Sequence, residues 1–446
     1  MRPLSRFEFA VQTLYWLGTA VFNVVQVQST DQAGLRAAAL SVINLIPLYL
    51  GNHLHTAAVW LGIPLEAMRR LHNSAALMVC VQSAIHVIIQ LTHHPFSMTD
   101  TTSRYGLFAL ISIAALAILP LVRRWLYEIF LKLHLGIAIF ALFAIWRHLR
   151  YAIAPPAAYI IACAITLLTT MTYSTCRLVY RNIVFGRPFP KARVKHRENA
   201  TQIEVSLPRP WKIQAGEYVQ IWLPGIGIWS WLESHPSMVT WWDEDSRGHV
   251  RVISVLLVAR RGLTAKVRLQ TRPDVWYNAL IDGPYGCPKS LAHYGTVILI
   301  ASGIGIAATV PLAKQLVTRR RAGTACTKQI KLFWQLEHGQ REWVFDWMTD
   351  LLELDKHDHI LNITLYDTSQ RTLGQQSDTD GSHNRMVTHF CEMNIEDSLE
   401  EAISRLEGRT IVAVSCDAEL RDRAQREVRK AIMDEIEFHD LEFQPW

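Results

Sequence analysis

Six long apolar runs lie between residues 9 and 179 of this 446-residue chain, and they constrain its fold more than any other feature. They cover residues 9–27, 37–57, 71–91, 105–122, 127–149 and 157–179. Each run is close to the ~20 residues that a helix needs to cross ~30 Å of hydrocarbon. The first run is long and has no small-residue cleavage site, which excludes a cleavable signal peptide. We therefore expect six transmembrane helices.

The chain changes character after residue 184. Charged residues become frequent, short alternating runs are typical of strands, and proline and glycine separate them. We expect a multi-domain membrane protein, with a transmembrane domain over residues 1–185, an antiparallel β-barrel over 186–290 and an α/β domain over 291–446. Residues 367–398 are rich in Ser, Asp and Gly, which predicts a solvated loop.

Composition removes several classes of protein. Half of the residues are apolar and 19% are charged, which excludes a disordered chain. The seven cysteines are scattered without a CxxC pair, which argues against a structural zinc site or a disulfide framework. The net charge is +6, but no long basic run accompanies it, so we expect no nucleic-acid partner.

Basic residues at the helix ends predict the topology. One set of ends is rich in them, at Arg2, Arg6, Arg69, Arg70, Arg123, Arg124, Lys132, Arg177 and Arg181. The opposite ends carry only Arg36, Arg104, Arg147 and Arg150. The positive-inside rule then places both termini and the polar half of the chain in the cytoplasm. In this topology the third and fifth helices run parallel.

Two histidine pairs lie inside the predicted membrane helices. His72 and His86 are 14 residues apart on the third helix, and His134 and His148 are 14 residues apart on the fifth. Fourteen residues are close to four helical turns, so each pair shares a face over a rise of ~21 Å. We expect His72 to face His134 and His86 to face His148, as axial ligands of two haem irons. The alternative is that they bond to neighbouring helices or reach toward the membrane surface.

The polar half carries the pattern of a nucleotide-binding protein. Strand-like runs at 192–195, 202–207, 218–223 and 250–258 predict the antiparallel barrel. An apolar strand at 296–301 is followed by a glycine-rich turn and a helix to Arg321, an arrangement that binds phosphate at a helix N-terminus. Further strands, predicted at 330–334, 360–366 and 410–415, alternate with helices and indicate a parallel sheet.

These features together resemble the fungal ferric-chelate reductases, in the superfamily that includes the NADPH oxidases. The resemblance covers almost the whole chain. It implies a six-helix transmembrane di-haem bundle, an FAD-binding β-barrel over 186–290 and a nicotinamide-binding α/β domain over 291–446, like that of ferredoxin reductases. The equal spacing of the two histidine pairs resembles ferric reductases more than NADPH oxidases.

The resemblance also implies site residues. The flavin would be bound by three motifs: His235, Pro236, Ser237 and Met238; Arg261, Gly262, Leu263 and Thr264; and Gly283, Pro284, Tyr285 and Gly286. The nicotinamide pyrophosphate would lie on Ser302, Gly303, Ile304, Gly305 and Ile306. Hydride transfer would take place beside Cys416, with the terminal Trp446 over the flavin ring.

The chain also departs from the family pattern. Ser302 replaces a glycine of the nucleotide turn, and Asp417 and Ala418 replace the Gly-Pro that usually follows the cysteine. Relatives often place an arginine for the 2′-phosphate where this chain has Glu337, and a carboxylate there favours NADH. The basic run 319–321 either compensates for Glu337 or only complements the helix dipole.

The resemblance implies an enzyme of the plasma membrane, surrounded by lipid. Electrons would pass from cytosolic NADPH or NADH through FAD and two haem b groups to ferric or cupric chelates on the opposite side. Two other functions stay open: reduction of dioxygen to superoxide, and a non-catalytic haem-binding membrane subunit with a degenerate nucleotide domain. A metal channel would give no reason for the flavin barrel. Monomer and oligomer both remain open.

Overall fold

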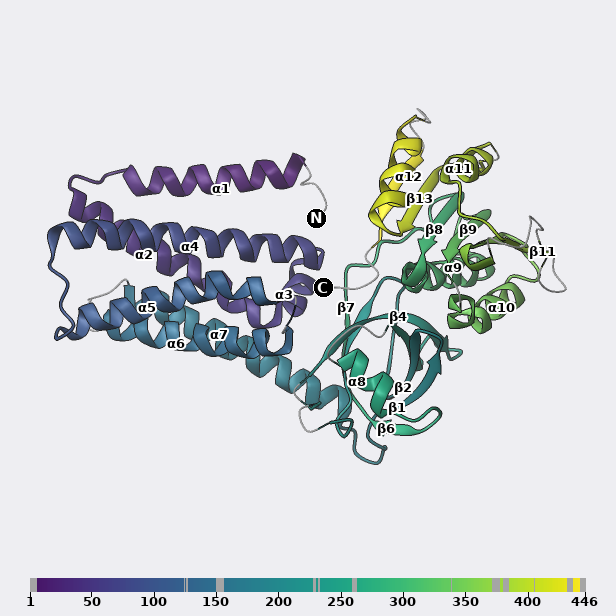
Figure 1. The fold of residues 1–446 in the computed structure, drawn as a ribbon, viewed down its shortest axis with the longest axis horizontal. Helices are drawn as coiled ribbons and strands as arrows, with labels where there is room; N and C mark the ends of the chain where they lie inside the picture. Colours follow the sequence, from purple (N-terminus) through teal and green to yellow (C-terminus); the bar gives the residue numbers. More distant parts are fainter. Residues whose placement is uncertain are drawn as a thin grey trace. The chain divides into compact units, whose positions relative to one another are not determined.

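The computed structural model describes residues 6–123, 125, 127–149, 156–227, 230–231, 233–258, 263–337, 339–370, 378–379, 385–404, 406–430 and 436–441. The chain divides into two compact units, Met1–Cys176 and Arg177–Trp446. The first unit is helical, and the second contains two seven-stranded sheets (Figure 1).

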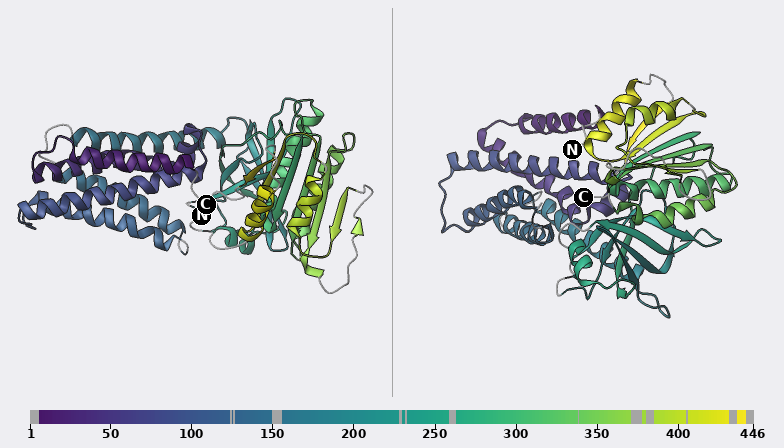
Figure 2. Two further views of the ribbon diagram at one scale, coloured as in Figure 1. Left: turned by 90° about the horizontal axis from the view of Figure 1, so that it is seen from above. Right: turned by 45° about the vertical axis from the view of Figure 1, so that its right-hand side comes forward.

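The helices of the first unit run alongside one another (Figures 1 and 2). They are α1 (Arg6–Val24), α2 (Thr30–Leu48), α3 (Leu54–Leu61), α4 (Leu65–His93), α5 (Thr101–Ile118), α6 (Tyr127–His148) and α7 (Pro156–Asn182), with short 3₁₀ turns η1 (Tyr49–His53) and η2 (Leu119–Val122). Among the described residues, five helices are long and apolar enough to cross a membrane: Thr30–Gly51, Leu65–His93, Thr101–Val122, Ile129–His148 and Pro156–Asn182. The predicted span at 9–27 is helical up to Val24, in α1, but is not among these five, so a sixth crossing stays a prediction.

The second predicted helix, 37–57, differs from the structure at both ends. It begins earlier, at Thr30, because the Ser29 hydroxyl caps it by accepting a hydrogen bond from the backbone N–H of Gln32. It ends earlier, at Leu48, one residue after Pro47, and the chain continues through η1 into the separate helix α3.

Apolar side chains cover the outside of the helical unit as well as its interior. The interior cluster includes Val42, Leu45, Val79, Ala144 and Cys163. Large exposed side chains are distributed over the outside, among them Phe7, Leu77, Ile88, Phe140 and Ile165. An apolar outer surface of this extent needs an apolar solvent, as expected for helices surrounded by lipid.

The first sheet of the second unit is antiparallel throughout, as predicted. It contains β1 (Lys191–Arg197), β2 (Ala200–Trp211), β3 (Tyr218–Trp222), β4 (His235–Glu244), β5 (Val250–Val258), β6 (Trp276–Asn278) and β7 (Leu280–Tyr285), in the order β6-β1-β2-β5-β4-β3-β7. Only Ala279 separates the two edge strands along the chain, so the sheet curls into a barrel-like form (Figure 1).

The second sheet is parallel except for one short edge pair. Its strands are β8 (Thr296–Ser302), β9 (Gln329–Leu336), β10 (Leu361–Asp367), β11 (Asp378–Thr379), β12 (Met386–His389), β13 (Thr410–Ser415) and β14 (Ile436–Asp440), in the order β11-β12-β10-β9-β8-β13-β14. Helices α9 (Ile306–Arg321) and α10 (Phe345–Leu354) pack on one face, and α11 (Ile395–Ile403) and α12 (Ala418–Lys430) on the other. This is a nucleotide-binding type of α/β layer arrangement.

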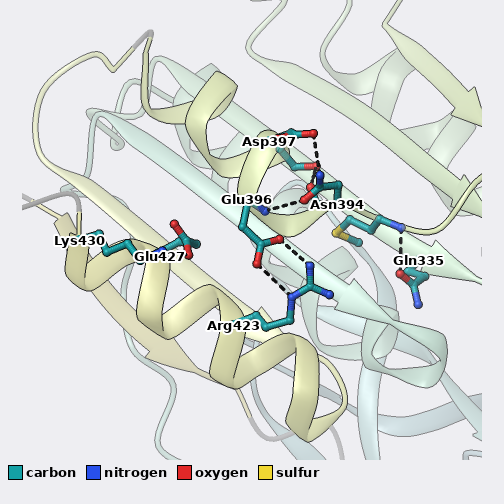
Figure 3. Close-up of polar contacts among 9 residues, drawn as sticks. Gln335, Asn394, Glu396, Asp397, Arg423, Glu427 and Lys430 are labelled. Atoms are coloured by element: carbon teal, nitrogen blue, oxygen red, sulfur yellow. Dashed lines mark hydrogen bonds and ion pairs between the residues drawn. The ribbon is translucent and has the colours of Figure 1, made fainter.

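The prediction of a loop over 367–398 is wrong in part. Residues 371–377 and 380–384 lie outside the described residues, but β12 and the start of α11 fall inside the predicted loop. β12 is only four residues long and forms by pairing with β10. Its local sequence does not predict this pairing. Asn394 caps α11, and the ion pair between Arg423 and Glu396 joins α12 to it (Figure 3).

Candidate functional site

The structure brings the four membrane histidines together as two facing pairs. The ring centres of His72 and His134 are 6.4 Å apart, and those of His86 and His148 are 6.3 Å apart. The first residue of each pair lies on α4 and the second on α6. Because residues in the same order on both helices face each other, α4 and α6 are parallel.

The separations within the pairs suit a single metal atom. An imidazole nitrogen binds a metal at ~2.0–2.1 Å and lies ~1.2 Å from its ring centre, so a metal between two rings separates their centres by ~6.5 Å. No group of three or more His, Cys, Asp or Glu residues in the described part of the chain could hold a metal ion. Two facing imidazoles therefore fit a haem iron, which receives its other four nitrogens from the porphyrin.

Backbone carbonyls orient one of the two pairs. The Nδ1 atom of His86 is 3.0 Å from the carbonyl oxygen of Gly34, and Nδ1 of His148 is 2.8 Å from that of Thr102. A ring that donates from Nδ1 keeps Nε2 available for a metal. Nδ1 of His72 and of His134 is buried, and it has no hydrogen-bond partner among the residues described.

Two glycines make room for histidine rings. A Cβ atom at Gly51 would lie 2.5 Å from Cε1 of His72, and a Cβ at Gly106 would lie 2.8 Å from Nδ1 of His148. Both distances are far below normal van der Waals contact, so each ring lies directly against a helix backbone.

Two of the predicted flavin motifs lie on either side of β3. His235, Pro236, Ser237 and Met238 begin β4, and Gly283, Pro284 and Tyr285 end β7, followed by Gly286. Tyr218 on β3 pairs with Met238 on one side and with Tyr285 on the other, and the two tyrosine rings stack with centres 5.7 Å apart. Residues from separate parts of the chain thus meet on adjacent strands.

His235 has the properties of a ligand-binding side chain. Its Nε2 atom is buried and has no hydrogen-bond partner in the described structure. Burial lowers the pKa of His235 to about 4, so the ring is neutral at physiological pH. A buried, unpaired imidazole nitrogen fits a bound group that supplies the missing partner, as a flavin would.

The third flavin motif is only partly described. Arg261 and Gly262 lie outside the described residues, whereas Leu263 and Thr264 open helix α8 (Leu263–Gln270). The N-terminus of a helix suits the predicted pyrophosphate contact. Trp446 also lies outside the described residues.

The nucleotide turn follows β8 directly. Ser302 ends the strand, Gly303 to Gly305 form the turn η3 (Gly303–Gly305), and Ile306 begins α9. A Cβ at Gly305 would lie 1.7 Å from the carbonyl oxygen of Ser415, so only glycine fits against the end of β13. The Trp334 indole fixes the turn by donating to the Gly303 carbonyl at 3.0 Å.

Two of the residues that depart from the family pattern, Ser302 and Asp417, contact each other. The Ser302 hydroxyl lies 3.1 Å from Oδ2 of Asp417 and accepts a hydrogen bond from the Asp417 backbone N–H at 2.9 Å. The second carboxylate oxygen of Asp417 accepts from Glu419 and Leu420 and so caps α12. A fixed negative charge therefore lies beside the nucleotide turn.

Cys416 lies at the same edge of the sheet, directly after β13. Burial, together with the nearby Asp417 carboxylate, raises the pKa of the Cys416 thiol to about 12. The thiol is therefore protonated at physiological pH and is a poor nucleophile.

Glu337 lies at the edge of the sheet that carries the glycine turn, whereas the basic run 319–321 lies at the far end of α9. Glu337 follows β9, which is parallel to β8, so it shares an edge with the glycine turn. The arginines end α9, whose 16 residues span ~24 Å from that turn. This distance favours the helix-dipole explanation, and compensation for Glu337 stays a prediction.

Sequence reasoning missed the contacts that α7 makes with β7. The sequence pattern places Arg177 only at a basic helix end and does not point to Asn182, yet both bond to the strand that carries the Gly283–Gly286 motif. Their partners are 99 or more residues away in the chain, so no local pattern points to them.

Two protein-family models match parts of this chain. Residues 36–145 match the family model of the ferric reductase like transmembrane component, and residues 294–429 match the ferric reductase NAD binding domain. The chain therefore carries both the membrane component and the nicotinamide-binding domain of ferric reductases, and the resemblance drawn from its motifs is confirmed.

The curated relatives are fungal ferric reductases. "Probable cell surface ferric reductase kap2" of Aspergillus oryzae is 23% identical over 79% of this chain and 48% of its own length. "Ferric reductase transmembrane component 5" of Saccharomyces cerevisiae is 24% identical over 94% of this chain and 61% of its own length. "Ferric/cupric reductase transmembrane component 2" of the same yeast is 23% identical over 70% of this chain and 44% of its own length. The chain thus spans about half the length of these relatives.

Proposed function

We propose that this chain is a transmembrane reductase that transfers electrons from NADH or NADPH, through FAD and two haem b groups, to ferric or cupric chelates across the membrane. The observation that carries the proposal is the pair of stacked histidine sites, each with a ring separation that suits one iron atom. They occur in the same chain as a flavin-type barrel and a ferric reductase NAD binding domain.

The residues of the membrane unit would hold the haems. His72 and His134 would bind one iron, and His86 and His148 the other. Bis-histidine ligation leaves no open position on the iron, so the haems supply single-electron transfer, and FAD supplies the conversion from hydride to single electrons. The Gly34 carbonyl, bonded to Nδ1 of His86, would leave Nε2 of that ring available to bind the iron.

The second unit would hold the two nucleotides. The neutral imidazole of His235 would hydrogen-bond the flavin, and the backbone N–H groups of the Gly303–Gly305 turn would bind the nicotinamide pyrophosphate. The Glu337 carboxylate would repel a 2′-phosphate, which supports NADH as the better donor.

The basic helix ends support a topology with both termini in the cytoplasm, and the name of the Aspergillus relative supports the plasma membrane. Nicotinamide nucleotides would then bind inside, and the chelates would be reduced outside.

The test is anaerobic stopped-flow spectroscopy of the purified, FAD-loaded full chain. Addition of NADH should reduce both haems, and NADPH should act more slowly. Subsequent ferric chelate should reoxidise the haems faster than dioxygen does. Faster reoxidation by dioxygen would favour the superoxide-forming alternative.

One observation favours a second function. The Asp417 carboxylate beside the nucleotide turn opposes an anionic ligand, as expected for a haem-binding subunit with a degenerate nucleotide domain. In that case dithionite would reduce the haems, and neither nicotinamide would.

A further inference from the structure

The last turns of α7 contact the strand that carries the Gly283–Gly286 motif. The Arg177 Nε atom lies 3.1 Å from Oδ1 of Asp282, and its Nη2 atom donates to the carbonyl of Pro284 at 3.3 Å. The same guanidinium lies over the ring of Tyr285, 4.5 Å from the ring centre. The side chain of Arg177 is 14% exposed and that of Asp282 only 7%, so the ion pair is shielded from water.

The Asp282 carboxylate extends this contact into the motif. One of its oxygens accepts a hydrogen bond from the backbone N–H of Gly283, and the other accepts from the Tyr285 hydroxyl. Arg177 therefore fixes the first and third residues of the motif through one buried carboxylate.

Asn182 holds Ile281, the residue before Asp282, through two hydrogen bonds to its backbone. Its amide nitrogen donates to the carbonyl of Ile281 at 2.7 Å, and its amide oxygen accepts from the Ile281 N–H at 2.8 Å. This pattern imitates a neighbouring strand along β7, which is an edge strand of its sheet. Asn182 is 1% exposed, so both backbone groups would be buried without a partner if the amide were removed.

We propose that Arg177 and Asn182 are positioning residues for the flavin. They hold β7 so that the Gly283–Gly286 backbone and the stacked Tyr285 ring keep the geometry that binds FAD. The inference rests on the proposed function, since it assumes that this motif binds the flavin. It also means that α7, one of the membrane-spanning candidates, ends by building part of a nucleotide site.

The experiment measures FAD binding to the purified, full-length, flavin-depleted protein by quenching of flavin fluorescence. Arg177→Met and Asn182→Leu should each weaken FAD binding about tenfold. The first leaves the buried Asp282 carboxylate without its cation, and the second leaves the Ile281 N–H and carbonyl without their partner. Arg177→Lys keeps the charge but not the forked contact, and should restore part of the affinity. Asp282→Asn tests the same contact from the other side and should weaken binding as Arg177→Met does.

Arg209→Met is the matched control. Arg209 also contacts α7, with its Nε donating to the carbonyl of Tyr180 at 2.6 Å and its guanidinium 4.0 Å from that ring, but neither contact involves β7. It should leave FAD affinity within about twofold. Haem content, measured in parallel, shows that the membrane unit of each variant is folded, and an unchanged far-UV circular dichroism spectrum shows that the second unit is folded.

The outcomes separate the two proposals. Equal FAD affinity in the unaltered protein and in all β7-contact variants would overturn the positioning role and leave the proposed function intact. An equal loss of affinity in Arg209→Met would also overturn it, because the effect would then be general destabilisation. Failure of the unaltered protein to bind FAD would refute the proposed function, and this inference with it.

Discussion

In the proposed di-haem protein, replacement of Gly106 by alanine should remove one haem and leave the other. The added Cβ would lie 2.8 Å from Nδ1 of His148 and 2.9 Å from its Cε1. Normal contacts between such atoms are ~3.5–4.0 Å, so the ring must move by about 1 Å. The lengths of metal–nitrogen bonds vary by only ~0.2 Å, so a shift of this size would break the proposed bond between His148 and the iron.

The same shift would break the contact that orients the ring. The hydrogen bond from His148 Nδ1 to the Thr102 carbonyl is 2.8 Å long, and an extra ~1 Å takes it beyond hydrogen-bond range. The His86–His148 site thus loses both its ligand geometry and its support, whereas the His72–His134 site, nearly four turns away along both helices, keeps its ligands.

The assay is the haem-to-protein ratio of the purified full chain by pyridine haemochrome. It should fall from two to one in Gly106→Ala, and also in Gly51→Ala, which would crowd His72 from 2.5 Å. Gly136→Ala on α6 is the control, because, apart from its chain neighbours and the backbone of its own helix, no heavy atom of the described residues lies within 4 Å of its Cβ position. Two haems with unchanged spectra in Gly106→Ala would refute the packing argument, and loss of both haems would refute the independence of the two sites.

Three further predictions concern the second unit. Asp417→Asn keeps the helix cap but removes the negative charge beside the nucleotide turn. The Kd for NADH should therefore fall about threefold to tenfold. An unchanged Kd would contradict the electrostatic argument. Glu337→Arg should improve kcat/KM for NADPH relative to NADH by about tenfold or more in steady-state assays, and an unaltered ratio would place the 2′-phosphate elsewhere. Burial raises the pKa of the Glu217 carboxyl to about 7 in the folded protein. Protonation of Glu217 therefore stabilises the folded state at low pH, and this stabilisation is lost as pH rises from about 4.5 to about 7. Glu217→Gln should therefore lose less thermal stability than the unaltered protein between about pH 5 and about pH 8, and parallel losses would contradict this.

Much of the fold follows from sequence patterns because those patterns are local. The bounds of β5 and β13 agree with the prediction residue for residue, since a mainly apolar run between polar turns defines each strand. The facing of His72 with His134 also follows from helical periodicity once the two helices are parallel.

The remainder depends on contacts between distant segments. The run at 37–57 stays apolar beyond Leu48, so hydropathy does not show the helix end that follows Pro47, and β12 exists only because β10 lies beside it. The bond between Ser302 and Asp417 joins residues 115 apart, so neither substitution could be understood alone. Such features can be explained only from the folded structure, because they depend on tertiary contacts between distant segments.

The parallel arrangement of α4 and α6 has an electrical consequence. It stacks the two histidine pairs, the proposed electron-carrying sites, ~21 Å apart along the helix axes, which is most of the thickness of the hydrocarbon layer. In the proposed topology, each electron that reaches the outer site moves one negative charge outward, a displacement worth about 2.3 kcal/mol per 100 mV. An inside-negative membrane potential would therefore drive the reaction forward, and each turnover would in turn discharge that potential.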